Sequence, residues 1–360
     1  MDAGAKAEDD WNKLFADYAA KFPDAKKLWD EYFAPVDAEK LLADENFWAR
    51  EEKAQATRAS SGTMINRLAK IMPNLVGGSA DLAPSNKTAM KDAGDFSRDN
   101  YAGRNLHFGI RELAMTGIVN GMILHGGLHA YCATFFVFAD YMKPMMRLAS
   151  LMKLPAIYVL THDSIGVGED GPTHEPIEQL AMLRAQPNLN VFRPADLMET
   201  AVAWYSAVTS KETPTVLALT RQNLPQLAGS SKEALKGGYV ISEAAGDCAG
   251  ILIASGSEVS LAIDAQAELA KENIFVRVVS MPCMDLFEQQ SDEYKESVLP
   301  SNVKARVAIE AGTNFGWGSY ACATVTMKGF GASAPANTLF KKFGFTKENV
   351  VATFKKVAAC

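Results

Sequence analysis

Short apolar segments recur between longer amphipathic stretches along most of the chain. Apolar runs bounded by turn residues indicate buried strands, and apolar residues three and four apart indicate helices. The predicted strands are residues 156–160, 191–192, 215–219, 250–254, 275–279 and 306–309. The predicted helices include residues 57–70, which Pro73 stops, residues 258–271, and a closing helix after Thr346. This alternation predicts an α/β fold of two domains, each a mostly parallel sheet flanked by helices.

The first 50 residues show helical spacing and no strand pattern. Trp11, Leu14, Phe15 and Tyr18 follow one another at intervals typical of an apolar helix stripe, which needs a surface to lie on. We expect a helical connecting arm or, equally well, an ordinary peripheral helix pair. A shift to small and polar residues at 226–238 marks a boundary, so the expected organisation is an arm at 1–50 and domains at 51–230 and 231–360.

Composition excludes several classes of protein. The net charge is -6, and no Lys/Arg cluster suggests nucleic acid or an anionic membrane surface. No apolar run reaches membrane-spanning length, and charged residues follow Met1 too closely for a secretory signal. The five cysteines are odd in number and scattered, which is typical of reduced residues in a cytoplasmic protein: Cys132, Cys248, Cys283, Cys322 and Cys360.

Residues 162–178 form the segment richest in candidate chemistry. They follow the predicted strand 156–160, so they should lie at its carboxyl end, where open α/β sheets bind ligands. Within them, residues 166–171 match the dinucleotide fingerprint G-x-G-x-x-G. Glu169 and Asp170 stand where a pyrophosphate would lie, however, and Pro172 follows the last glycine, which argues against a nucleotide.

Three other interpretations of this segment remain open. His162, Asp170 and His174 could bind a metal, although their spacing of eight and four matches no standard metal motif. In a sugar site, Asp170 would accept hydrogen bonds from hydroxyl groups while the imidazoles donate to oxyanions and move protons. The third interpretation is a glycine-rich turn with incidental polar groups. The segment holds two of only five histidines, which argues against this interpretation.

A second candidate lies at the start of an apolar helix. Residues 109–124 carry apolar side chains all round, with Arg111 and Glu112 as the only charges, so we expect a buried helix and a buried Glu112. A buried carboxylate must be paired, take up a proton or face a ligand nitrogen. Adjacent helical residues do not face each other, which disfavours pairing with Arg111.

An aromatic set and a group of cations complete the candidates. Phe135, Phe138 and Tyr141 are three apart, which predicts one broad helical face that is core unless a flat heterocycle binds beside it. Residues that could together hold a phosphate are Arg58, Ser85, His162 and Arg221, the last of which follows strand 215–219. Residues 255–257, Ser-Gly-Ser before a predicted helix, form a weaker candidate for an anion site.

Six motifs, in order and spacing, make the chain resemble the transketolase family. They are Gly77-Gly-Ser-Ala-Asp-Leu82, Phe108-Gly-Ile-Arg-Glu112, Thr161-His-Asp-Ser-Ile-Gly-Val-Gly-Glu-Asp-Gly-Pro-Thr-His174, Arg193-Pro-Ala-Asp196, Arg221-Gln-Asn-Leu-Pro225 and Phe330-Gly-Ala-Ser-Ala-Pro335. The resemblance implies a pyrimidine-binding domain at 51–230 and the family's C-terminal domain at 231–360. It also implies thiamine diphosphate as cofactor and transfer of a two-carbon ketol unit between sugar phosphates, as in the pentose phosphate pathway.

The resemblance assigns a role to each candidate residue. Glu112 matches the glutamate that contacts the aminopyrimidine ring nitrogen, and Phe138 matches the stacking ring, with Phe135 and Tyr141 beside it. Asp170 matches a residue that binds a substrate hydroxyl, and His174 one near the reacting carbonyl. The residues that match the family's binding site for the sugar phosphate are Arg58, Ser85, His162 and Arg221. Asp81 lies in the cofactor-side loop.

The family's diphosphate and metal signature, which begins with Gly-Asp-Gly, does not occur in this sequence. We therefore expect a C-terminal half, either a natural subunit or a truncated form, with Mg or Ca bound only through a complementary N-terminal subunit. The resemblance implies a homodimer that is inactive or nearly so alone. Two alternatives stay open: a non-catalytic dimeric binding or assembly module, and half of a related enzyme such as dihydroxyacetone synthase or deoxyxylulose phosphate synthase.

Overall fold

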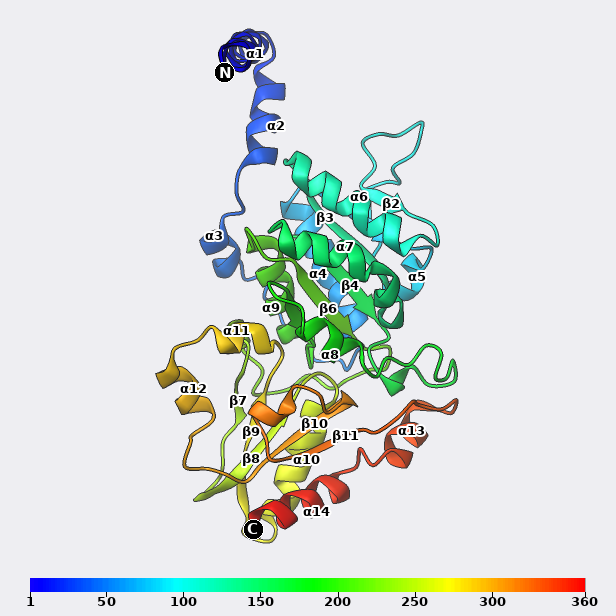
Figure 1. Cartoon of the computed structure of the whole chain (residues 1–360), viewed down its shortest axis with the longest axis vertical. Helices are drawn as coiled ribbons and strands as arrows, with labels where there is room; N and C mark the ends of the chain where they lie inside the picture. Colours follow the sequence, from blue (N-terminus) through cyan, green and yellow to red (C-terminus); the bar gives the residue numbers. More distant parts are fainter. Residues whose placement is uncertain (360) are drawn as a thin grey trace.

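The computed structural model describes residues 1–359. Two sheets lie one below the other along the long axis, and an arm projects above them (Figure 1). The upper sheet is entirely parallel, in the order β2-β1-β3-β4-β6-β5. Its strands are β1 Leu75–Ser79, β2 Asn105–His107, β3 His129–Phe135, β4 Ile157–Thr161, β5 Asn190–Phe192 and β6 Thr215–Leu219. The three strands predicted for this domain are confirmed.

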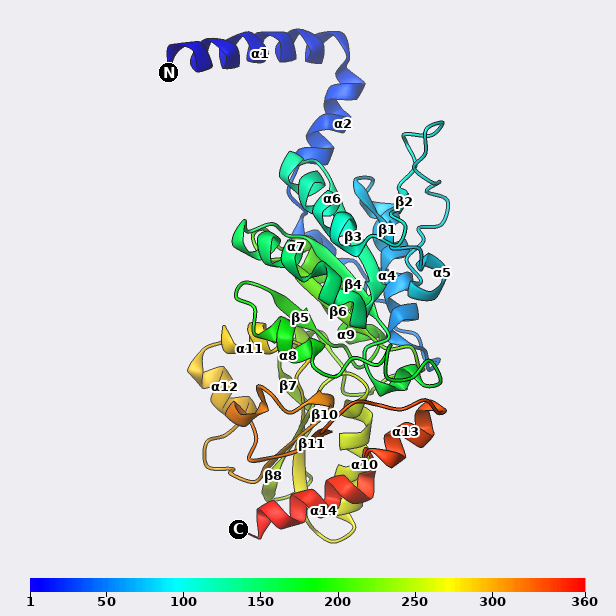
Figure 2. The same ribbon diagram turned by 45° about the vertical axis from the view of Figure 1, so that its right-hand side comes forward.

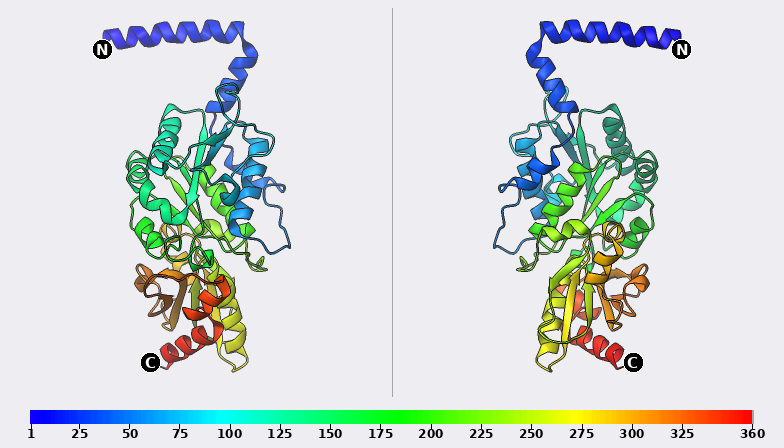
Figure 3. Two further views of the ribbon diagram at one scale, coloured as in Figure 1. Left: turned by 90° about the vertical axis from the view of Figure 1, so that its right-hand side faces the viewer. Right: turned by 90° about the vertical axis from the view of Figure 1, so that its left-hand side faces the viewer.

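Helices cover both faces of the upper sheet. Helices α4 and α9 lie on one face, and α6, α7 and α8 lie on the other (Figure 3). Their apolar side chains form the cores on the two faces. The helices are α4 Thr57–Ile71, α5 Ala83–Asn86, α6 Glu112–His125, α7 Ala139–Leu151, α8 Gln179–Arg184 and α9 Leu197–Thr209. The 3-10 turns η1 Phe136–Phe138 and η2 Ile165–Val167 follow β3 and β4.

The lower sheet is mixed, in the order β11-β10-β8-β9-β7, with β7 antiparallel to β9. Its strands are β7 Tyr239–Ser242, β8 Cys248–Ala254, β9 Phe275–Ser280, β10 Arg306–Thr313 and β11 Ala323–Met327. Its helices are η3 Lys232–Lys236, α10 Glu258–Ala270, α11 Met284–Glu288, α12 Asp292–Val298, η4 Trp317–Ser319, α13 Ala336–Lys342 and α14 Lys347–Ala358. The predicted fold class, two α/β domains with mostly parallel sheets, is confirmed.

The first residues form the predicted helices, but most of their apolar stripe lies on no surface of this chain. The arm consists of α1 Asp2–Lys21, α2 Pro23–Phe33 and α3 Ala38–Ala43. Helix α1 projects away from the body (Figure 2), and Trp11, Leu14 and Tyr18 are exposed. Trp11 stacks on Phe15 at 5.0 Å between centroids, and Phe15 contacts Trp29 of α2 at 5.3 Å, so the rings cover mainly each other.

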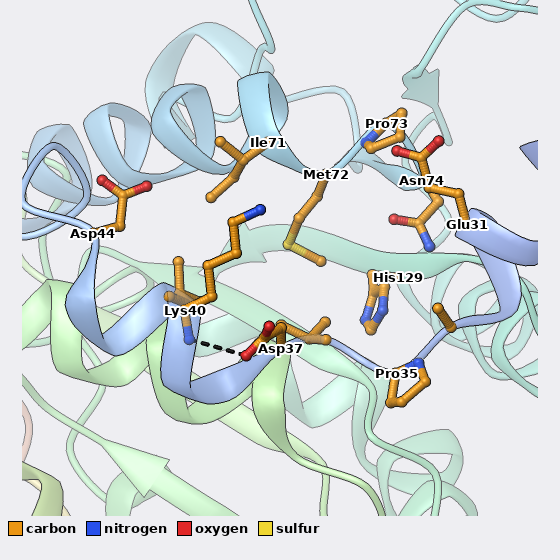
Figure 4. A pocket seen from close by; sticks show the side chains of 13 residues that line it. Glu31, Pro35, Asp37, Lys40, Asp44, Ile71, Met72, Pro73, Asn74 and His129 are labelled. Atoms are coloured by element: carbon orange, nitrogen blue, oxygen red, sulfur yellow. Dashed lines mark hydrogen bonds between the residues drawn. The ribbon is translucent and has the colours of Figure 1, made fainter.

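A cavity of about 530 Å³ lies where the arm meets the body. His129, Lys40 and Ile71 line it (Figure 4). His129 begins β3 and Asn74 precedes β1, so this cavity lies at the amino ends of the strands. It is therefore at the edge of the sheet opposite to the one where the sequence places the chemistry.

Helix α6 is buried on one side only, which corrects the prediction of a helix buried all round. Its buried residues include Met115 and Val119, whereas Leu113, Ile118 and Leu124 are 48%, 50% and 56% exposed. An apolar outer face of this kind is typical of a surface that another chain covers. Across residues 1–359, no helix is both long and apolar enough to span a bilayer.

Candidate active site

Parallel pairing brings the ends of three neighbouring strands to one edge of the upper sheet. Phe135 at the end of β3 is in register with Thr161 at the end of β4, and Thr161 is in register with Leu219 at the end of β6. His162 and Arg221, which follow β4 and β6, therefore lie at the same edge, as the sequence predicted. Arg58 reaches this edge from the first turn of α4.

Hydrogen bonds fix the tautomer of the buried His162 ring. The Thr161 hydroxyl donates to Asn86 Oδ1 at 2.7 Å, so it can only accept from His162 Nδ1, which also lies 2.7 Å away. His162 is thus neutral with its proton on Nδ1. Its Nε2 then accepts from Arg58 Nη1 at 3.4 Å.

Positive charge gathers around this imidazole. Burial, followed by the charges of Arg58, Arg221 and His174, lowers the pKa of His162 to about 3. Burial and the neighbouring Arg221 also lower the pKa of Arg58. The second contact of Arg58 Nη1 is the backbone carbonyl of Ser85, at 2.8 Å. Neither Arg58 nor Arg221 makes an ion pair within residues 1–359, so an anion at this edge would relieve the repulsion in the cluster.

The three aromatic residues form a parallel series, but not on one helical face as predicted. Phe135 ends β3, Phe138 ends η1 and Tyr141 lies in α7, because the strand runs on to Phe135 before the chain turns. The rings of Phe135 and Phe138 are 6.2 Å apart with 7° between planes, and those of Phe138 and Tyr141 are 6.1 Å apart with 28°. The series presents flat apolar faces to a ligand.

His174 lies beside this series and is half-buried. Its ring stands edge-on to Phe138 at 5.7 Å and to Phe135 at 6.3 Å, and its Nδ1 is 2.9 Å from the Thr173 hydroxyl. Asp170 and Asp81 are exposed, and Asp81 has a left-handed backbone with φ of 60°. Neither carboxylate makes a hydrogen bond or ion pair within residues 1–359.

Glu112 is the first residue of α6 and is 9% exposed, so its predicted burial is confirmed. Its Oε1 accepts a hydrogen bond from the Thr134 hydroxyl at 3.4 Å. The side chain makes no ion pair with Arg111, which is exposed. Glu112 lies in the first turn of α6, and its carboxyl group is free to hydrogen-bond a ligand at this edge.

Three of the candidate sites considered from the sequence do not fit the structure. Residues 166–171 form a 3-10 turn and loop, and the next α-helix, α8, begins only at Gln179, so no helix N-terminus faces the glycines. Residues 255–257 hold a cation instead of an anion, because the Arg193 guanidinium donates to the Ser255 carbonyl at 2.9 Å. No His, Cys, Asp or Glu cluster suited to a metal occurs in the part of the chain that the structure describes.

Sequence reasoning overlooked two buried charged residues next to the candidates. Glu175 follows His174, is 2% exposed, and neither carboxylate oxygen has a hydrogen-bond partner within residues 1–359. Arg193 is fully buried and pairs with Asp163, the residue after His162, at 2.8 Å. The apolar neighbours Pro176 and Ile177 were a signal for the burial of Glu175. No comparable signal marked Arg193, because its partners lie far away in sequence.

Comparison with known families agrees with this arrangement. The family description "Transketolase, pyrimidine binding domain" matches residues 53–226, and "Transketolase-like TK C-terminal domain" matches residues 237–346. The chain belongs to the transketolase family. The transketolase of Bacillus subtilis is 55% identical over 97% of this chain and 54% of its own length. The chloroplastic transketolase of Solanum tuberosum is 51% identical over 99% of this chain and 49% of its own.

Solved transketolase structures share the fold. The transketolase from Leishmania mexicana superposes with a TM-score of 0.92 at 45% identity, over 99% of this chain and 53% of that one. The chain thus spans about half the length of these three transketolases. A structure titled "Split gene transketolase, inactive beta4 tetramer" superposes with a TM-score of 0.67 at 26% identity, over 85% of this chain and 99% of that one.

Membership of the transketolase family, with its pyrimidine-binding domain, implies thiamine diphosphate as the cofactor. The residues present fit a flat ring with hydrogen-bond donors. Phe138 and Tyr141 present ring faces to such a ring. The buried Glu112 carboxyl group can hydrogen-bond it, because the hydrogen bond from the Thr134 hydroxyl to Glu112 is long, at 3.4 Å.

Proposed function

We propose that this chain supplies the pyrimidine-binding and sugar-binding sides of a transketolase, which transfers a two-carbon ketol unit from a ketose phosphate to an aldose phosphate. The observation that carries the proposal is the shared edge of the upper sheet. There, a cationic cluster around His162 meets an aromatic series at Phe135, with 3.7 Å between the two ring centroids. A phosphorylated sugar and a flat cofactor ring are the ligands that these two surfaces suit together.

On the cofactor side, the Glu112 carboxyl group would hydrogen-bond the aminopyrimidine ring nitrogen, accepting from that nitrogen when it carries a proton, and Phe138 would stack on the ring. Phe135 and Tyr141 would complete the pocket, and Asp81 belongs to the loop beside it. When bound, thiamine diphosphate supplies the nucleophilic carbon and the electron sink that carbon–carbon cleavage needs. The task of these residues is to orient the ring and exclude water from it.

On the sugar side, the guanidinium groups of Arg58 and Arg221 would hold the phosphate, with Ser85 and His162 beside them. Since His162 Nε2 carries no proton in the structure, the ring must take one up or change tautomer in order to donate to a phosphate oxygen. Asp170 would bind a sugar hydroxyl. His174, edge-on to the aromatic series, is placed to hold or move a proton near the reacting carbonyl.

The exposed apolar face of α6 supports assembly with a second copy. Leu113, Ile118 and Leu124 lie on α6, and Tyr141, Leu148 and Leu151 on α7 are also exposed. We propose a cytoplasmic homodimer, with residues 51–230 and 231–360 as its domains and residues 1–50 as the connecting arm. A complementary N-terminal subunit would provide the diphosphate and Mg or Ca site.

Reconstitution tests this proposal. The chain is mixed with an N-terminal transketolase half that carries the diphosphate-binding domain, together with thiamine diphosphate, Mg²⁺ and a ketose and aldose phosphate pair. We expect turnover from the mixture and little from either part alone. Glu112→Gln should lower kcat by about 100-fold or more, whereas the control Glu348→Gln, at a first-turn glutamate of α14, should not.

Three results would contradict the proposal. A mixture that binds thiamine diphosphate yet shows no turnover with any sugar phosphate would argue for a binding or assembly module. Full activity of Glu112→Gln would show that the buried carboxylate has no part in the reaction. Turnover confined to formaldehyde or pyruvate-type partners would instead favour one of the related thiamine enzymes.

A further inference from the structure

One guanidinium joins the edge that carries His162 to the lower sheet. Arg193 follows β5 and is fully buried, and its Nε donates to Asp163 Oδ2 at 2.8 Å. Its Nη1 donates to the Ser255 carbonyl at 2.9 Å and to the Glu258 carboxylate, and Nη2 donates to the Ser257 hydroxyl at 3.1 Å. Residues 255–258 form the turn between β8 and α10, so the side chain bridges both sheets.

The turn in the lower sheet is shaped around this side chain. Gly256 has φ of 55°, and a Cβ there would lie 2.8 Å from Arg193 Cγ. Its amide donates to the Arg193 carbonyl at 2.9 Å, and the Arg193 amide donates to the Pro282 carbonyl at 2.8 Å. Both the backbone and the guanidinium of Arg193 are therefore held by the lower sheet.

The other end of the bridge is the residue after His162. Asp163 is 1% exposed, and its Oδ1 has no hydrogen-bond partner within residues 1–359. Within these residues, the Asp163 carboxylate is therefore bound by Arg193 alone, through Oδ2. A buried carboxylate that loses such a partner is left with an uncompensated charge. The position of Asp163, and of the backbone before it, therefore depends on the guanidinium.

His162 itself needs such support. Its φ of 65° is in the left-handed region, which a non-glycine residue keeps only where the surroundings hold it. Within the upper sheet it is held by the Thr161 hydroxyl and by the ring of Phe135. The Asp163–Arg193 pair adds a further support, which originates in the lower sheet.

We propose that Arg193 is a positioning residue through which the lower sheet holds His162 for binding of the sugar phosphate, and so sets the preference for phosphorylated over unphosphorylated sugars. This inference rests on the proposed role of His162 at the phosphate. It gives the C-terminal domain a part in substrate binding, although the proposed phosphate-binding residues all lie within 58–221 of the sequence.

Substitution of Arg193 by lysine tests the idea, because lysine keeps the positive charge but not the forked geometry. Arg184→Lys is the matched control. The Arg184 side chain is largely buried and also joins the two sheets, through paired bonds of 2.8 Å to Glu310, but this pair does not include a neighbour of His162. Both variants should lower the Tm by a similar amount.

Binding of inorganic phosphate to the full chain is followed through the imidazole NMR signals of the five histidines. We expect Arg193→Lys to shift the His162 signals and to weaken phosphate binding about tenfold, with Arg184→Lys unchanged. In the reconstituted enzyme, KM for a ketose phosphate should rise about tenfold in Arg193→Lys, with kcat and the KM for the unphosphorylated ketose unchanged.

A second pair of variants keeps the test decisive if Arg193→Lys does not fold. Asp163→Asn retains an oxygen that can accept from Arg193 Nε, so phosphate binding should stay near the wild-type value, whereas Asp163→Ala should weaken it. Equal phosphate binding in all variants, with only Tm lowered, would overturn the inference while the proposed function stands. A wild-type chain whose His162 signals do not respond to phosphate would overturn both.

Discussion

The imidazole ring of His162 lies on the phenyl ring of Phe135, with 3.7 Å between centroids and 30° between planes. The contact exists because β3 and β4 are adjacent and parallel, so that their ends coincide. Phe135 also belongs to the aromatic series, with Phe138 at 6.2 Å. One ring thus joins the proposed phosphate side of the site to the proposed cofactor side.

Replacement of Phe135 by leucine should therefore weaken the binding of both phosphate and thiamine diphosphate. Leucine keeps apolar volume but offers no flat face to His162 or Phe138, a loss of about 1 kcal/mol of ring contact and about fivefold in each affinity. Calorimetric titration with inorganic phosphate, and with thiamine diphosphate in the reconstituted enzyme, measures both. Phe315→Leu, at an exposed ring, is the control. Weakening of one ligand alone would contradict the shared role.

The fold and the shared edge could be predicted from sequence because they depend on local patterns. The runs at 156–160 and 215–219 are apolar throughout, as expected of central parallel strands, and they became β4 and β6. Once these strands are parallel, His162 and Arg221 must lie at the same edge. No long-range information was needed for that step.

The errors arose where the outcome depended on packing between distant segments. A spacing of three suits a helix, yet Phe135 ends a strand because β3 pairs along its whole length with β1 and β4. An apolar helix surface predicts burial but does not indicate whether the same chain or another chain covers it. In this chain one face of α6 is buried and the other is exposed. Arg193 and Glu258 are 65 positions apart in the sequence, and a periodic pattern of residues cannot predict a contact between them.

Removal of either arginine near His162 should raise the pKa of its imidazole. Burial is the largest cause of the low value of about 3 and would remain, so Arg58→Gln or Arg221→Gln should raise it by about one unit or less. Titration of the His162 NMR signals measures this. Phosphate affinity should fall in the same variants, and Arg98→Gln, at an exposed arginine, should change neither. An unchanged pKa would show that the cations do not act on the ring.

A charge on the outer face of α6 should prevent self-association. Ile118 is 50% exposed in the middle of this apolar face, and a lysine there would have to be desolvated in a dimer. We expect Ile118→Lys to shift the mass from dimer to monomer in light scattering, with Tm at low protein concentration nearly unchanged. Ile71→Lys is the matched control, because Ile71 is 48% exposed on α4. Identical masses for Ile118→Lys and wild type would exclude this face as the interface.

Glu175 should make the stability of the chain depend on pH near neutrality. Burial raises the pKa of this carboxyl from 4.5 to about 7, and the nearby backbone amide of Ala332, which does not reach hydrogen-bond geometry, offsets this only in part. A Cβ on Gly331 would overlap the carboxylate, so the 330–335 segment lies tightly over it. Between pH 4.5 and 7 the folded chain holds a proton that the unfolded chain has released. The free energy of unfolding should therefore fall as the pH rises through this range.

Glu175→Gln removes the titration while keeping the shape of the side chain, so it should abolish that slope. Relative to wild type, the variant should gain about 3 kcal/mol between pH 4.5 and pH 8, measured by urea unfolding at both values. Glu178→Gln, at an exposed glutamate of the same segment, should leave the slope in place. Because Glu175 follows His174, the same ionisation should also displace the His174 loop. Reconstituted Glu175→Gln should then keep its turnover above pH 7, where wild-type turnover declines, and parallel pH profiles for the two would show that the buried carboxyl affects stability alone.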